Sequence, residues 1–360
     1  MSGMGFEIGG RRIGPGQPPY VIAELSANHG QELERALELV GLAADAGADA
    51  VKLQTYTPDT ITLASDKPWF RIESGTRWDG RTLHDLYAEA YTPWEWHAQL
   101  KAAAEARGMQ LFSSPFDATA VELLESLKVP AYKIASFEIV DLGLIRLAAS
   151  TGKPLIISTG MATLAEIEEA VGAARAAGAT QIALLKCTSS YPAPPEEANL
   201  ATIPHLAAAF HVPVGLSDHT MGIAVPVAAV ALGAVIVEKH MTRARADGGP
   251  DGAFSTEPDE FAAMVRAVRE AALAVGGVSY TPTAHEVGSR RLRRSLFVVE
   301  DLAAGDELTP QNVRSIRPGD GLHTRHAEEV YGRRAARAID RGTPLSWDLL
   351  EPDGTDWPTD

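Results

Sequence analysis

Two apolar segments late in the chain each end in an acid close to a histidine. "VGLSDHTMG" breaks at Asp218 and His219, and "AVIVEKHMT" runs into Glu238 and His240. Two histidines with oxygen ligands nearby suit Mn²⁺, Fe²⁺, Co²⁺ or Zn²⁺ better than Ca²⁺, and such an ion polarises a carbonyl group. These residues therefore predict a divalent-metal site in which Asp218 and Glu238 orient the imidazoles. Capped turns and hydrogen-bonded core residues are the alternative interpretation.

A second group of polar residues is suited to binding an anion. Two lysines and several hydroxyls lie at or just after other short apolar runs, and together they suit a phosphate and a carboxylate. Each residue alone is more often a surface or helix-capping residue, so the hypothesis depends on their meeting at one place. Glu24, at the end of the first run, is a candidate acid, base or hydroxyl-positioning group. The other members are Lys52, Gln54, Ser114, Lys133, Ser136, Glu138, Ser158, Ser189 and Tyr191.

All these residues lie in or just after eight short runs, rich in β-branched residues, that alternate with helical patterns. The runs are almost continuously apolar, as parallel strands are when both faces of the sheet are buried. Eight strand–helix units predict a (β/α)8 TIM barrel, an α/β fold whose active site lies at the carboxyl ends of the strands. The rival, a doubly wound sheet, would show a Gly-rich phosphate loop after the first strand, and "AELSANHG" is not one. The runs are 21–24, 50–54, 109–114, 131–136, 154–159, 182–187, 214–218 and 234–240.

The chain divides by composition into three parts. The barrel is predicted to span 1–277, and a turn-rich, then basic segment at 278–294 is typical of a linker. Residues 295–355 change to short strands broken by Gly-Asp and Gly-Thr-Pro turns, which predicts a small, mostly β domain. Within the barrel, the connection 55–92 is unusually long and rich in Trp, Arg and Gly, as functional loops often are.

Charge and composition argue against several classes of partner. A net charge of −15 disfavours nucleic acid or an anionic membrane as the main partner. Cys187 is the only cysteine, so no intrachain disulfide forms, which fits the cytoplasm, as does an amino terminus without an apolar leader. The apolar run 221–237 has 17 residues, whereas a membrane span needs roughly 20. We interpret it as a buried helix that stops at Gly233 and continues into a strand.

Several motifs resemble those of the sialic acid synthase family, whose members condense phosphoenolpyruvate with a sugar. They are "IAELSANHGQ", "GADAVKLQTYTPDT", "LFSSPFD", "ISTGMAT", "KCTSSYP", "GLSDHT" and "EKHMT…GPDGAFS". The tail, with "RPGDGL", resembles the antifreeze-like (SAF) domain that ends these enzymes. "SANHGQ", "KLQTYTPDT" and "CTSSYP" resemble the pseudaminic acid synthase branch rather than the N-acetylneuraminate branch. Gly30 stands where the family more often has Asn.

The resemblance implies a reaction and a set of roles. Carbon 3 of phosphoenolpyruvate adds to the aldehyde of an open-chain N-acetylated sugar, here 2,4-diacetamido-2,4,6-trideoxy-L-altrose. Water adds at carbon 2, and the tetrahedral intermediate loses phosphate. A metal held by His219 and His240, expected to be Mn²⁺, polarises the aldehyde. Phosphoenolpyruvate would be bound by Lys52, Ser114, Lys133, Ser136, Ser158 and Ser189, and the sugar by Glu24, Gln54, Tyr191 and Asp251.

The resemblance also implies a homodimer. The SAF domain of one subunit would reach over the barrel of its partner and supply Arg317. Such a lid would exclude water until the adduct forms.

Two alternatives remain open from the sequence. The same chemistry could act on an N-acetylneuraminate or legionaminate precursor. A carbohydrate- or ice-binding protein is more remote, because the tail has no regular Thr repeat and that function would not explain the clustered lysines and histidines.

Overall fold

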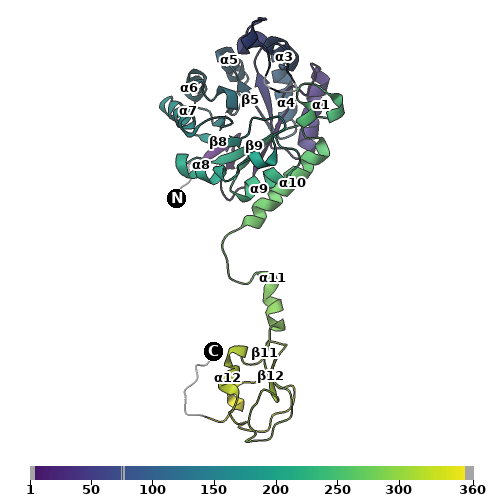
Figure 1. Ribbon diagram of the computed structural model, residues 1–360, viewed down its shortest axis with the longest axis vertical. Coiled ribbons are helices and arrows are strands. Elements are labelled where there is room, and N and C mark those ends of the chain that lie inside the picture. Colours follow the sequence, from purple (N-terminus) through teal and green to yellow (C-terminus); the bar gives the residue numbers. More distant parts are fainter. Residues whose placement is uncertain (1–4, 74, 76–77, 353–360) are drawn as a thin grey trace. The chain divides into compact units, whose positions relative to one another are not determined.

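The chain forms two compact units, Met1–Gly276 and Gly277–Asp360. The computed structural model describes residues 5–73, 75 and 78–352 (Figure 1). The first unit holds a closed parallel barrel and the second a small two-stranded sheet. The last three residues of the predicted small domain, 353–355, lie outside the described residues.

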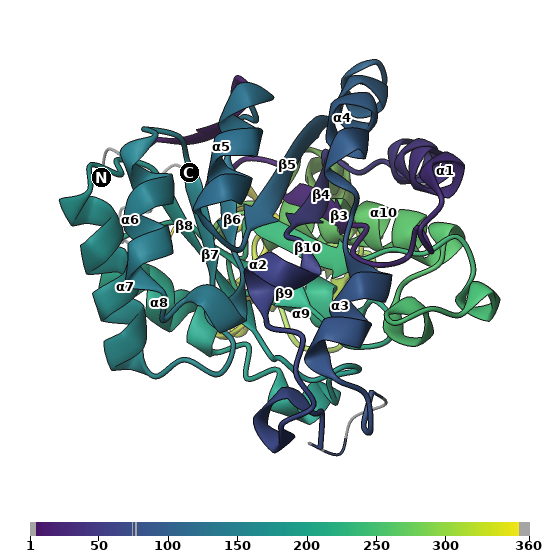
Figure 2. The same ribbon diagram turned by 90° about the horizontal axis from the view of Figure 1, so that it is seen from above.

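Eight parallel strands close the barrel in the order β10-β3-β4-β5-β6-β7-β8-β9 (Figure 2). This confirms the predicted (β/α)8 fold, and it places the first barrel strand beside the last, with His240 paired to Glu24. Nearly every strand residue is buried, because the barrel interior faces one side and the helices the other. The strands are β3 (Tyr20–Glu24), β4 (Ala50–Thr55), β5 (Gln110–Pro115), β6 (Tyr132–Ile134), β7 (Leu155–Ser158), β8 (Ile182–Cys187), β9 (Val214–Asp218) and β10 (Ile236–His240).

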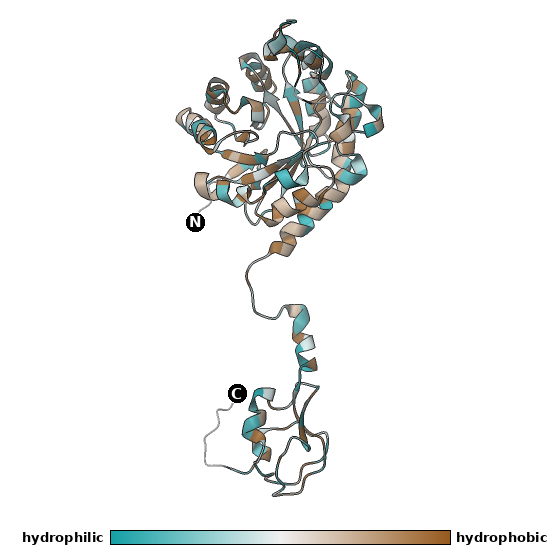
Figure 3. Cartoon of the chain, in the orientation of Figure 1, coloured by the Kyte–Doolittle hydropathy of each residue, from teal (hydrophilic) through white to brown (hydrophobic). Residues whose placement is uncertain are grey.

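Helices cover the outside of the barrel, and local sequence sets their ends. The longest, α10, buries Phe261, Met264, Val265 and Val268, and hydrophobic and hydrophilic residues alternate along it in Figure 3. Thr163 caps the start of α7 and forms a capping box with Glu166. The helices are α1 (Leu33–Asp45), α4 (His97–Glu105), α5 (Ala118–Ser126), α6 (Leu142–Ser150), α7 (Leu164–Ala176), α8 (Thr202–Phe210), α9 (Ala224–Ala231) and α10 (Pro258–Val275).

The apolar run 221–237 divides as expected between α9 and β10, with Gly233 between them. Among the described residues, no helix is both long and apolar enough to cross a membrane.

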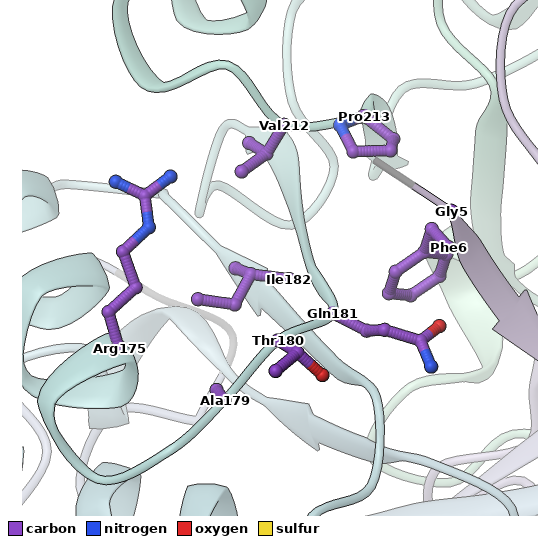
Figure 4. Close-up of a pocket in the computed structure, with 9 residues that line it drawn as sticks. All are labelled: Gly5, Phe6, Arg175, Ala179, Thr180, Gln181, Ile182, Val212 and Pro213. Carbon is purple, nitrogen blue, oxygen red and sulfur yellow. The ribbon is translucent and has the colours of Figure 1, made fainter. Parts of the chain in front are cut away.

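The amino end of the barrel is covered by a hairpin of β1 (Phe6–Ile8) and β2 (Arg11–Ile13). Beside it lies a cavity of about 280 Å³, at the starts of β8 and β9 (Figure 4). Its one charged lining residue, Arg175, donates a hydrogen bond of 2.7 Å to the Phe210 carbonyl. Because the starts of β8 and β9 lie at the amino end of the barrel, the cavity is at the opposite end from the predicted site. Its lining residues are Gly5, Phe6, Arg175, Ala179, Thr180, Gln181, Ile182, Val212 and Pro213.

The long connection after β4 folds into short helices rather than an open loop. It contains α2 (Pro58–Ile61), η1 (Pro68–Phe70), α3 (Leu83–Ala90) and η2 (Trp94–Trp96). From it, the Trp78 indole Nε1 donates to the Pro250 carbonyl at 3.2 Å. The connection is thus tied to the loop that follows β10, at the carboxyl end of the barrel.

The second unit has its own core around the antiparallel pair β11 (Ser295–Val298) and β12 (Val313–Ile316). Leu296, Val298, Leu308 and Val313 are fully buried within it. The segment predicted as a linker contains the short helices α11 (Ala284–Val287) and η7 (Gly288–Leu292). The remaining short elements of the chain are η3 (Ser136–Glu138), η4 (Pro195–Glu197), η5 (Arg245–Asp247), η6 (Gly252–Phe254), η8 (Thr324–His326), α12 (Ala327–Val330) and η9 (Trp347–Leu349).

Candidate active site

Four charged side chains from four strands meet inside the carboxyl end of the barrel. We call Glu24, Lys52, Lys133 and Glu238 the buried quartet. Lys52 Nζ pairs with Glu24 Oε2 and lies 3.6 Å from Glu238 Oε1. Lys133 Nζ lies 3.4 Å from the same Glu238 oxygen. All four are almost completely buried, so acids and lysines alternate where solvent screens them little.

Burial and mutual pairing shift the titration of the quartet. Burial raises the pKa of Glu24, against the opposing field of Lys52. Burial alone would also raise the pKa of Glu238, but Lys133 and Lys52 hold it below its ordinary value. Burial lowers the pKa of Lys133, whereas the two glutamates outweigh burial at Lys52 and raise its pKa. Lys133 is therefore the more readily deprotonated lysine, and Glu24 the more readily protonated acid.

Other predicted residues contact the quartet directly. Lys52 Nζ donates to Ser114 Oγ at 3.4 Å, and Gln54 Nε2 donates to Glu24 Oε1 at 3.3 Å. The Ser26 amide also donates to Glu24 Oε1, at 2.9 Å. Glu24 is therefore held by three neighbours.

Hydroxyl groups beside the quartet form a cradle around Gly160. The Gly160 amide lies 3.1 Å from Ser136 Oγ. A Cβ added at Gly160 would overlap Ser189 Oγ and lie 2.7 Å from Ser136 Oγ, so only glycine leaves this space open. Ser158 Oγ is buried and has no hydrogen-bond partner among the described residues. Hydroxyls and a backbone amide next to two lysines suit a phosphate.

His219 and His240 face each other at the same end, with ring centroids 5.3 Å apart. His219 Nδ1 lies 2.8 Å from the Thr188 carbonyl, which only accepts, so Nδ1 carries a proton and Nε2 is the nitrogen left for a metal. His240 Nδ1 lies 3.1 Å from Ser26 Oγ. Burial lowers the pKa of His240 well below its usual value, which keeps that ring neutral. Burial disfavours a charge on His219, but Cys187 and the Thr188 carbonyl outweigh burial and raise the pKa of His219, so this ring would give up its Nε2 proton when a metal binds. Two imidazoles this close together can act as ligands for a divalent metal.

The described residues contain no group of three or more His, Cys, Asp or Glu placed to hold a metal. The donor set is thus two imidazole nitrogens with the remaining positions open. Mn²⁺ accepts such mixed coordination, with water and ligand oxygens completing it. The residues present fit the predicted metal.

Asp218 and Glu238, predicted to orient the imidazoles, form no direct hydrogen bond to either ring among the described residues. Asp218 pairs with Lys239 and accepts from the Thr220 amide at 3.1 Å. Glu238 belongs to the quartet. The rings are held instead by the Thr188 carbonyl and the Ser26 hydroxyl. Neighbours in a strand point to opposite faces, so Asp218 faces away from the imidazoles.

Aromatic rings line the mouth next to the imidazoles. The Tyr191 ring lies 4.3 Å from that of His219, 5.1 Å from Phe254 and 6.1 Å from Trp78, between centroids. We call Trp78, Tyr191 and Phe254 the aromatic wall. Burial raises the pKa of Tyr191, so the phenol stays protonated and can donate a hydrogen bond.

Three further predicted residues have separate positions. Asp251 Oδ2 accepts from the Ala27 amide at 3.4 Å, so it also lies at the mouth. Glu138 follows β6 in η3, and burial raises its pKa to about 7. Arg317 is an exposed residue of the second unit, after β12, and is not among the residues that the barrel brings together.

Sequence reasoning missed Ser26, Trp78, Phe254 and the contacts of Lys239. Phe254 and Trp78 come from loops, where neither helix nor strand periodicity applies. Lys239 lies between Glu238 and His240 and, by strand alternation, had to face the other way. That signal was present in the sequence.

The fold agrees with that of similar proteins. Residues 39–280 match the model of the NeuB family, and residues 293–351 match that of the SAF domain. The chain is 46% identical to a pseudaminic acid synthase from Helicobacter pylori, over 93% of this chain and 98% of that protein. It is 44% identical to a pseudaminic acid synthase from Campylobacter jejuni, over 91% and 95%.

A solved structure matches as well. The crystal structure of an N-acetylneuraminic acid synthetase from Leptospira borgpetersenii, in complex with citrate, aligns with a TM-score of 0.71 and 33% identity. The alignment covers 79% of this chain and 94% of that chain.

Proposed function

The chain belongs to the NeuB family, and from this premise we propose that it is a pseudaminic acid synthase. It would condense phosphoenolpyruvate with 2,4-diacetamido-2,4,6-trideoxy-L-altrose and release pseudaminic acid and phosphate. The observation that best supports this reaction is that two lysines, a hydroxyl cradle and two imidazoles lie together at one end of the barrel. The relatives named pseudaminic acid synthase, similar over nearly their full length, support the choice of substrate.

The anionic end of phosphoenolpyruvate would bind between the lysines and the cradle. Lys52 and Lys133 supply positive charge, and Gly160 leaves room for phosphate oxygens. Lys52 already bonds Ser114, so one lysine can bridge the two parts of the site. The phosphate-binding hydroxyls would be Ser114, Ser136, Ser158 and Ser189.

The sugar would lie on the other side, between Glu24 and the aromatic wall. Gln54 and the Ser26 amide hold Glu24 Oε1, which fixes this carboxyl against the substrate. Because burial raises its pKa, Glu24 is suited to hold a proton and pass it to the aldehyde oxygen while carbon 3 of phosphoenolpyruvate forms its bond to the aldehyde carbon. Tyr191 and Asp251 would contact the sugar, and Glu138 would contact either substrate.

His219 and His240 would hold the metal, which we propose to be Mn²⁺. When bound, the metal supplies Lewis acidity toward the sugar aldehyde. The chain holds the two imidazoles close together through the contacts of His219 with the Thr188 carbonyl and of His240 with the Ser26 hydroxyl.

We further propose a homodimer in which the SAF domain of each subunit covers the mouth of its partner and brings Arg317 to it. Large apolar side chains stay exposed in the loops after the strands: Phe137 at 59%, Met161 at 61% and Met221 at 47%. On the predicted linker, at the start of the second unit, Val278 and Tyr280 are 93% and 98% exposed. Such side chains favour a covering surface, and a second copy supplies one.

The aromatic wall favours this sugar over a fully hydroxylated one. A 2,4-diacetamido-2,4,6-trideoxy sugar carries two acetyl methyls and the methyl at carbon 6. Methyl groups gain by packing on aromatic rings, whereas hydroxyls there would lose their water. N-acetylneuraminate and legionaminate precursors are the alternatives with the same chemistry.

An assay of phosphate release tests the proposal. Purified full-length protein with Mn²⁺ and phosphoenolpyruvate is offered the deoxy-diacetamido sugar, a legionaminate precursor or N-acetylmannosamine. We expect phosphate release with the first sugar, and its loss when EDTA removes the metal. Turnover of N-acetylmannosamine but not of the first sugar would overturn the substrate, and no phosphate with any of them would overturn the reaction.

A further inference from the structure

Asp218 and Lys239 form an ion pair that lies outside the barrel interior and touches none of the substrate-binding residues assigned above. They are paired in register on β9 and β10, and both side chains are only 2% exposed. Each precedes a histidine of the proposed metal site in the sequence. Because strand residues alternate, the pair faces outward, while His240 faces inward.

The Asp218–Lys239 pair forms hydrogen bonds to the backbone of Thr220, the residue that follows His219. Lys239 Nζ donates to the Thr220 carbonyl at 2.5 Å as well as to Asp218. Asp218 Oδ1 accepts from the Thr220 amide at 3.1 Å and from its hydroxyl at 2.8 Å. The residues before and after His219 are thus joined to each other and to β10. The carbonyl of His219 accepts from the Ala193 amide at 2.9 Å, so its peptide is held on a further side.

Stability alone is a weak reason for such a pair. Burying two charges costs hydration free energy that their mutual attraction scarcely offsets. Proteins with apolar replacements are often as stable. A buried pair does fix geometry, because its partners tolerate few other arrangements. Here the fixed geometry is the backbone that carries one imidazole, tied to the strand that carries the other.

We propose that Asp218 and Lys239 are positioning residues that set His219 against His240, so that the affinity for a divalent cation depends on them. The inference rests on the proposed metal site. Neither residue would bind the cation. Their loss would let the 218–220 turn move and would spoil the facing arrangement of the two rings.

The test measures Mn²⁺ binding to the full-length protein by electron paramagnetic resonance of the free ion, with unfolding by denaturant on the same samples. The variants are Lys239→Met and Asp218→Asn, and His219→Ala marks the site. Asp49→Asn is the matched control, since it removes a partly buried carboxylate from two arginines at the amino end of the barrel. We expect Lys239→Met and Asp218→Asn to raise the Mn²⁺ Kd about tenfold or more. Asp49→Asn should leave the Kd within about twofold while lowering stability.

The outcomes separate this inference from the proposed function. Folded Lys239→Met and Asp218→Asn proteins that bind Mn²⁺ like the parent would overturn it and leave the metal site intact. If Lys239→Met is recovered unfolded, Asp218→Asn decides, because Asn keeps the volume and an oxygen for Thr220. A parent protein whose Mn²⁺ binding is unaffected by His219→Ala would overturn the metal site itself, and this inference with it.

Discussion

At the amino end of the barrel, Asp49 accepts from the Val21 amide at 2.8 Å and pairs with both Arg11 and Arg269. At the carboxyl end, two lysines share the two acids of the buried quartet, and Ser158 Oγ and Glu138 Oε2 have no hydrogen-bond partner among the described residues. A buried polar atom without a partner costs about 1–3 kcal/mol. Tyr20 Oη, at the start of β3, also lacks a partner among the described residues. The two ends differ instead in their charges, because arginines balance Asp49 at the amino end, whereas lysines, hydroxyls and imidazoles that a ligand can contact gather at the carboxyl end.

The largest expected effect comes from removing one of the two imidazoles at the carboxyl end. His219→Ala and His240→Ala should each lower kcat/KM for metal-dependent phosphate release about 1000-fold, since several kcal/mol of charge stabilisation would be lost. Steady-state phosphate assays at saturating Mn²⁺ measure it. Asp49→Asn should do the reverse, lowering the denaturation midpoint while the rate per folded molecule is unchanged. Unchanged activity in either histidine variant would contradict the metal assignment.

Lowering the pH should reduce the free energy of unfolding through two buried histidines near the carboxyl end of the barrel. Burial lowers the pKa of His29 and of His97 to about 4, so the folded chain keeps both rings neutral. The stability they give is complete above about pH 6.5 and is lost as the pH falls toward 4, because the unfolded chain binds the protons more readily. At pH 5 the loss should be about 2 kcal/mol for each ring.

Urea unfolding from pH 7.5 to 5 measures this loss. The double variant His29→Gln and His97→Gln should flatten the dependence, and His285→Gln, at an exposed position, should leave it unchanged. A parent protein equally stable at both pH values would argue against neutral buried rings.

A methyl group added in the hydroxyl cradle should weaken the binding of phosphoenolpyruvate without changing the affinity for the metal. Gly160→Ala places a Cβ against Ser136 and Ser189 and should raise the KM for phosphoenolpyruvate about tenfold. The Mn²⁺ Kd should not change. Gly172→Ala is the matched control, because nothing lies within 4 Å of its added Cβ in α7, and it should gain about 0.5–1 kcal/mol in stability. An unaltered KM in Gly160→Ala would place the phosphate elsewhere.

The smallest expected effect concerns the aromatic wall. Trp78→Phe removes the hydrogen bond to the Pro250 carbonyl but keeps an aromatic ring near Tyr191. The KM for the sugar should rise about threefold, with that for phosphoenolpyruvate unchanged. Trp69→Phe, in the same connection but 76% exposed, should have no effect. Equal changes in both KM values would mean that Trp78 acts on the whole mouth.

Much of the fold and part of the site followed from local patterns. Apolar runs of strand length alternating with helices determine a buried parallel sheet, and the fold then places every strand end at one mouth. This is why Lys52, Lys133, His219 and His240 could be grouped before any contact was known. The Gly30 position also has a local reason, since its φ of +57° is one that Gly and Asn tolerate better than other residues.

The tertiary structure decided which of these groups pair. Sequence adjacency suggested that Asp218 serves His219, but alternation along a strand turns neighbours to opposite faces, and the partner of Asp218 is Lys239 on the next strand. The pairing of Lys52 with Glu24 and Glu238, and the approach of Trp78 to Pro250, join residues far apart in the chain. Barrel closure and loop packing fix those contacts, because they depend on the summed geometry of all eight strands rather than on any local stretch of residues.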